Sequence, residues 1–211
     1  NYVNMFKKGN IIRDSAIFLD ENMTGNLNVL VQVTSNEGKG SLKNPDNLKD
    51  IEKLQLFLDR MDVVTSTISI SNVIKQLHKT IMDDNSEFET IPNSREKINN
   101  IFWLYSQNDD ADVSSLINYD NDIAIITALM KTFSTTQMTE YKTNIQNYIN
   151  TEIKNPNLNF ELSGVMTFLS DFIFLVIKSS IISIFTSIVL IGLISMYFFQ
   201  SWKFGLLSII P

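Results

Sequence analysis

Residues 179–202, SSIISIFTSIVLIGLISMYFFQSW, contain no charged residue and are bracketed by Lys178 and Lys203. An α-helix rises about 1.5 Å per residue and the hydrocarbon core of a bilayer is about 30 Å thick, so this stretch is long enough to cross a membrane. It follows a long polar region, whereas a secretory signal peptide stands at the start of a chain and has a shorter apolar core. We therefore predict a membrane protein with one large aqueous domain.

The helical pattern extends backwards from this stretch to the residue after Gly164. A helix from Val165 to Phe199 would be roughly 50 Å long at about 1.5 Å per residue, which is more than a bilayer. We predict a long helix over residues 164–203, with its transmembrane segment at 179–202. Its first turns are expected to project from the membrane and carry the aqueous domain.

Apolar residues return at 204–211, FGLLSIIP, after a short break. This stretch is expected to be the start of a further, truncated transmembrane helix. Because the chain also begins with Asn1 rather than Met, we expect a fragment of a longer multi-pass protein with sequence missing at both ends.

Small polar residues recur along one face of the predicted transmembrane helix: Ser179, Ser183, Ser187 and Ser195, with Gly192 nearby. In a bilayer, small residues at this spacing usually mark packing against a neighbouring helix. The alternative is a lining for a substrate or ion path, which is less favoured because hydroxyl groups alone bind protons poorly.

The negative charge lies in the aqueous part of the chain. The 211 residues have a net charge of −6, and residues 164–211 contribute +1, so residues 1–163 carry −7. An acidic domain argues against nucleic acid as a partner and against docking on anionic lipid.

The composition also excludes several kinds of catalytic or metal site. Cysteine is absent, and the single histidine, His78, cannot build a histidine zinc site or a Ser-His-Asp triad within this chain. Asp109, Asp110 and Asp112 lack the turn glycine and the spaced glutamate of a calcium loop, so we predict a solvated loop there. No phosphate-binding G-x-x-x-x-G-K-[ST] motif occurs. We predict that the chain is not an enzyme and carries no cofactor.

Four stretches of the aqueous part have strand character and alternate with helical patterns. Residues 123–130, IAIITALM, are nearly all apolar, so we expect a central strand with both faces covered. Ser134–Gln137 forms a capping box that begins a helix, and Ser71 is a candidate cap for an earlier one. The predicted strands are 26–34, 63–70, 123–130 and 157–162, and the predicted helices begin at Pro45, Asn72, Asn93 or Ser94, and after Ser134.

The order is strand, helix, strand, two inserted helices, strand, helix, strand. Without the inserted region, at about 71–121, this is the split βαβ repeat of the ferredoxin-like plan, with both helices on one face of a four-stranded sheet. We predict an α+β domain over residues 1–163 that continues into the long transmembrane helix.

A ferredoxin-like domain joined to a membrane helix resembles the porter domain of resistance-nodulation-division (RND) transporters. Residues 6–31, with Phe18-Leu19 followed by Asn22 and Gly25, resemble the segment after the first membrane helix in the lipid- and hydrophobe-exporting branch. That branch includes the mycobacterial large membrane proteins (MMPL). Val64–Leu77 resembles its strand-to-helix step. Leu162-Ser163-Gly164, Ser201–Lys203 and Gly205–Pro211 resemble its second membrane helix and the start of the third.

The resemblance implies a full protein with two similar halves, each with six membrane helices and one such extracytoplasmic domain. It implies a multi-pass protein of the cytoplasmic (inner) membrane that exports a hydrophobic or lipid-like substrate in exchange for protons. The proton-carrying acids of the superfamily lie on a later helix, outside this chain. The implied partners are membrane lipid, the second half of the transporter and a homo-oligomer, and Gly164 would couple the domain to the membrane.

Two other functions stay open: a membrane-anchored extracytoplasmic sensor and an accessory component of protein export. Phe102, Trp103 and Tyr105 either line a hydrophobic substrate path or pack the inserted helix on the sheet, and packing is favoured. His78 is expected at the surface or in a contact between helices rather than as a ligand.

Overall fold

The structure is a computed structural model that describes residues 3, 6–106 and 113–207. The chain divides into two compact units, Asn1–Phe168 and Leu169–Pro211, which are described separately below.

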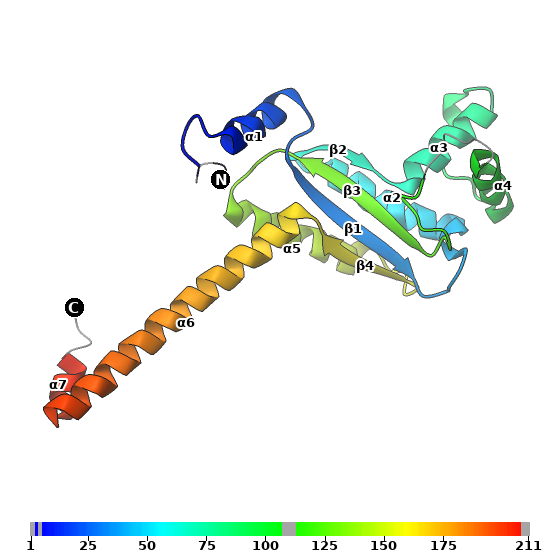
Figure 1. Cartoon of the computed structure of the whole chain (residues 1–211). Coiled ribbons are helices and arrows are strands. Elements are labelled where there is room, and N and C mark those ends of the chain that lie inside the picture. Colours follow the sequence, from blue (N-terminus) through cyan, green and yellow to red (C-terminus); the bar gives the residue numbers. More distant parts are fainter. Residues whose placement is uncertain (1–2, 4–5, 107–112, 208–211) are drawn as a thin grey trace. The chain divides into compact units, whose positions relative to one another are not determined.

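The first unit is built on one antiparallel sheet of four strands (Figure 1). The strands lie in the order β2-β3-β1-β4, so β1 and β3 are central, and each strand runs opposite to its neighbours. Strands β1 and β2 are therefore parallel to each other with β3 between them, and β3 and β4 are parallel with β1 between them. Their bounds are β1 Leu27–Ser35, β2 Val64–Ile68, β3 Ile123–Met130 and β4 Leu158–Ser163.

Two helices, α2 (Pro45–Asp59) and α5 (Thr135–Glu152), lie side by side on one face of this sheet (Figure 1). The rings of Phe57 and Tyr148 stack with centroids 3.9 Å apart and join the two helices. Strand β1 points Leu27, Val29, Val31 and Val33 into the resulting core, where at most 1% of each is exposed. The hydrophobic core of the unit therefore lies between the sheet and α2 and α5.

Strand β3 is central, as its apolar sequence predicts, but only one of its faces is buried. Ala124, Ile126, Ala128 and Met130 are buried, whereas the residues between them are half-exposed. The prediction that both faces are covered is wrong for the described chain. The reason is that α2 and α5 both cross the same face, so no helix is left to cover the other.

The step from β2 to α3 (Ile70–Ile81) also differs from the prediction. The strand ends at Ile68, and the helix is capped by Ser69 rather than by Ser71. Ser69 and Asn72 form a capping box in which each side chain satisfies a backbone N–H of the other. Ser71 lies in the first turn of the helix and is buried, and its hydroxyl donates to the carbonyl oxygen of Leu48 at 3.1 Å.

The inserted region contains α3 and α4 (Arg95–Ser106), as predicted, with the short 3₁₀ helix η3 (Ser86–Phe88) between them. Two more elements have no counterpart in the sequence prediction: α1 (Ile11–Asn22), capped by Asn10, and the 3₁₀ turn η2 (Ser41–Lys43). α1 buries Ala16 and exposes Ile11 and Phe18.

The second unit contains most of α6 (Val165–Phe199) and all of α7 (Trp202–Leu207). Within the described residues, α6 is the one helix long and apolar enough to cross a membrane. It ends at Phe199 because Gln200 adopts a left-handed conformation with φ +47°, so the predicted helix over 164–203 contains a break. A further membrane helix over 204–211 stays a prediction, since residues 208–211 lie outside the described part.

Candidate functional site

Gly164 forms the junction between the last strand and the long helix. Its φ of +94° is a conformation that residues with a side chain rarely adopt. A Cβ atom here would lie 2.9 Å from the carbonyl oxygen of Asn28 and 2.9 Å from the amide nitrogen of Leu30. Only glycine allows β4 to pass into α6 without an intervening loop, this close to the backbone of β1.

Asn28 of β1 caps the start of α6. Its Oδ1 accepts a hydrogen bond from Val165 N at 2.8 Å, across 137 residues of sequence. The first N–H groups of a helix lack partners within the helix, and Gly164 has no side chain that could serve. The first turn of α6 is thus held by the central strand, and Met166 in that turn is fully buried.

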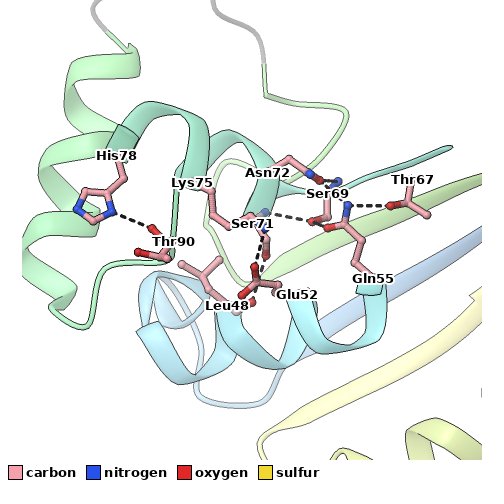
Figure 2. Close-up of polar contacts among 10 residues, drawn as sticks. All are labelled: Leu48, Glu52, Gln55, Thr67, Ser69, Ser71, Asn72, Lys75, His78 and Thr90. Atoms are coloured by element: carbon pink, nitrogen blue, oxygen red, sulfur yellow. Dashed lines mark hydrogen bonds and ion pairs between the residues drawn. The ribbon is translucent and has the colours of Figure 1, made fainter. Parts of the chain in front are cut away.

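A buried polar network joins α2, β2 and α3 (Figure 2). Gln55, which is 4% exposed, donates from Nε2 to Thr67 Oγ1 at 2.8 Å and to Asn72 Oδ1 at 2.6 Å. Ser69 Oγ donates to Gln55 Oε1 at 2.5 Å. One glutamine therefore fixes the end of β2 and the cap of α3.

The same contact continues along α3 through Lys75, whose Nζ pairs with Glu52 at 2.6 Å, partly shielded from solvent (Figure 2). Together with the hydrogen bond from Ser71 to Leu48, this ion pair holds α3 against α2.

Replacing Gln55 by alanine is expected to lower the free energy of unfolding of the first unit by about 2–3 kcal/mol, because the buried hydroxyl of Ser69 loses its acceptor. Thr67 is half-exposed and keeps its hydrogen bond to Asp59. Hydrogen–deuterium exchange of α3 measures the effect. Gln146→Ala is the matched control, since Gln146 is exposed and, within the described residues, its side chain hydrogen-bonds Asn150 at 3.3 Å and no other side chain. Its expected effect is below about 0.5 kcal/mol. Equal protection in both variants would contradict the role given to Gln55.

His78 makes a contact between α3 and the following loop, as one of the two predicted placements has it. Its Nδ1 donates to the carbonyl oxygen of Thr90 at 2.8 Å. The ring of Phe88 packs edge-on against the imidazole, with the two ring centroids 5.5 Å apart. The ring is 8% exposed, and Nε2 has no hydrogen-bond partner in the described part of the chain. The carbonyl can only accept, so the proton is on Nδ1.

The aromatic residues of α4 line a groove with a volume of about 490 Å³. The lining includes Phe102, Trp103 and Tyr105 of α4 together with Tyr119 of the loop before β3. Ile98 and Ile101 are buried, Phe102 and Tyr105 are half-buried, and Trp103 is 62% exposed, so packing does not account for Trp103. The groove is a second candidate site.

The other predicted site residues lie in the second unit. Ser179, Ser183 and Ser187 are exposed on α6, and Ser195 is half-exposed. Gly192 is buried, since Gly205 of α7 lies against Gly192 and Met196. Close approach of two glycines is typical of helix packing in membranes. A packing role for the serines stays a prediction.

Within the described residues, no group of His, Cys, Asp or Glu is arranged to hold a metal ion. The predicted solvated loop with Asp109, Asp110 and Asp112 lies outside those residues. Sequence reasoning missed Asn28 and Gln55, because each acts on a segment distant in the sequence.

No protein-family model, curated protein or solved structure significantly matches the chain. What the fold itself establishes is an α+β unit with a four-stranded antiparallel sheet, followed by one helix of membrane-spanning length and composition.

Proposed function

We propose that this chain is the first extracytoplasmic porter domain and second membrane helix of an RND-type exporter. The observation that carries the proposal is the junction at Gly164, where a sheet domain passes into a membrane-length helix through a single residue. A porter domain needs such a direct connection, since it has to follow movements that begin in the membrane. A tethered sensor or binding module needs no such connection.

The strand arrangement supports the ferredoxin-like plan. The order β2-β3-β1-β4, read from the other edge, is the order of two interleaved βαβ units, with α2 and α5 as the two crossover helices on one face. Helices α3 and α4 are then an insertion between the two units.

The proposed mechanism is alternating access. Protons bind to acidic residues on membrane helices outside this chain, and the resulting movement reaches the sheet through the first turn of α6. The domain then opens and closes a path for a hydrophobic or amphiphilic substrate leaving the outer leaflet. The partners are the second half of the same transporter, membrane lipid and further copies of the protein.

The first test is the complete reading frame, followed by transport. We expect a membrane helix before Asn1, further helices after Pro211 with an intramembrane aspartate, and a second copy of the strand–helix order. The full protein in vesicles is then expected to move a fluorescent lipid when a proton gradient is imposed, and to stop when an ionophore collapses it. A frame that runs into a polar signalling domain would favour the sensor, and gradient-independent movement would contradict the exporter.

A further inference from the structure

Lys43 is a half-buried cation at one end of the aromatic groove. Its Nζ lies 4.8 Å from the centroid of the Phe102 ring, in the range of a cation–π contact. Burial, and secondarily the nearby charge of Arg95, lowers the pKa of Lys43. In the described part of the chain no carboxylate lies within ion-pair distance of it.

The neighbouring cation, Lys39, has an acidic partner, whereas Lys43 has none within the described residues. Lys39, four residues earlier, pairs with Asp120 at 3.0 Å, and this contact raises the pKa of Lys39. Arg95 uses one nitrogen to donate to the carbonyl oxygen of Gly40 at 3.0 Å. Within the described residues, Asp120 is therefore paired with Lys39, and the nearby Asp122 accepts a hydrogen bond at 2.7 Å from Asn118, which lines the groove.

The groove is held in shape by backbone hydrogen bonds. Gly40 N donates to Asp120 O at 2.7 Å and Leu42 N to Asn121 O at 3.0 Å, which fixes the segment carrying Lys43 against the loop before β3. Asn121 adopts φ +53°, and its side chain donates to Tyr119 O at 2.8 Å. These hydrogen bonds hold the loop that bears Tyr119 in place.

We propose that this groove binds a single-chain anionic amphiphile, with a carboxylate at Lys43 and an aliphatic chain along Phe102 and Trp103. The volume falls in the usual range for small-ligand sites, which combine apolar walls with a few placed polar groups. A carboxylate supplies the counter-charge that Lys43 lacks. Tyr119, 98% exposed, and Trp103, 62% exposed, present the apolar surface that the chain covers.

The biological meaning rests on the proposed export function, since a groove of this kind would select the substrate. Binding itself is measured separately. The chain has two tryptophans, Trp103 and Trp202, so Trp202→Phe leaves Trp103 as the reporter of the groove. The probe is dodecanoate with a nitroxide near the end of its tail, titrated into the full chain in nanodiscs of neutral phosphatidylcholine.

We expect saturable quenching of Trp103. Lys43→Gln is expected to raise the dissociation constant about tenfold, the usual loss for one hydrogen bond to a charged group. Lys154→Gln makes the same charge change at an exposed lysine outside the lining of the groove and is expected to leave the constant within about twofold. The uncharged methyl ester of the probe is expected to bind Trp202→Phe as weakly as dodecanoate binds Lys43→Gln.

Quenching without saturation, or equal constants for Lys43→Gln and Lys154→Gln, would overturn the proposal. Equal binding of the methyl ester would assign the groove to neutral apolar ligands and overturn it as well. If the full protein exports lipid but the groove does not bind the probe, the binding site is contradicted and the export function is not. If the groove binds the probe but the full protein does not export, the export function is contradicted and the binding site is not.

Discussion

Replacing Gly25 by alanine is expected to lower the free energy of unfolding of the first unit by about 3–5 kcal/mol. Gly25 has φ +97°, and an added Cβ would lie 2.5 Å from the carbonyl carbon of Met130, 2.8 Å from the amide nitrogen of Lys131, and closer still to the Met130 oxygen. These are backbone atoms at the end of β3, which cannot rotate away. The central pair of strands would have to separate at that end.

Gly38→Ala is the matched control for this change. Gly38 has a similar φ of +84°, but an added Cβ would meet nothing within 4 Å. Gly38→Ala is therefore expected to lower the free energy of unfolding by about 1–2 kcal/mol, which is the cost of placing a residue with a side chain in a left-handed backbone conformation. The measurement is amide exchange of β1 and β3 in the full chain. Domains are stable by only about 5–15 kcal/mol and each 1.4 kcal/mol is about tenfold, so Gly25→Ala should speed the exchange of the slowest amides by roughly a hundredfold to several thousandfold. Similar protection in both variants would show that the close approach at Met130 carries no cost.

A flexible Gly-Ser insertion after Gly164 is expected to reduce export to the level of vesicles without protein, if the proposed function holds. The insertion moves Val165 N away from Asn28 Oδ1, so the first turn of α6 loses its attachment to β1. Movement of the membrane helices would then be absorbed by the inserted residues rather than reach the sheet. The measurement is gradient-driven lipid export.

The control is the same insertion at Gly38, in an exposed turn that connects β1 to η2. It is expected to leave export within about twofold, since long insertions in surface loops cost little. Exchange protection of β1 and β3 in both variants establishes that the sheet is still formed. Export that survives the insertion after Gly164 would contradict the coupling, while the groove and the fold would be unaffected.

Features decided by local patterns could be predicted from the sequence. The residue bounds of β3 and the start of α6 are as predicted, because a continuous apolar run between turn signals and an uncharged helical run need no knowledge of the rest of the chain. The capping box Ser134–Gln137 is confirmed for the same reason. The inserted pair α3 and α4 was predicted from its amphipathic spacing.

Features decided by neighbours distant in the sequence could not be predicted. Ser69 and Ser71 are both good caps, and the choice between them depends on Gln55, which reaches Ser69 from α2. The half-exposed face of β3 depends on where α2 and α5 cross. Asn28 and Lys43 belong to the candidate sites through contacts with α6 and α4 respectively, and neither contact leaves a periodic signal.

The attachment of the last strand to the first has a consequence for how the protein is made. On the ribosome, β1 emerges early, but the edge that pairs with β4 has no partner until residues 158–163 have been synthesised. Asn28 can accept the hydrogen bond from Val165 N only after 137 further residues have been added. The sheet therefore closes only as the apolar helix begins to leave the exit tunnel. Contacts of such long sequence separation form slowly, and an open strand edge is prone to wrong pairing in the meantime. Closure of the sheet and emergence of the membrane-length helix are thus late and nearly simultaneous events, and until then the unfinished sheet exposes the surface that chaperones bind.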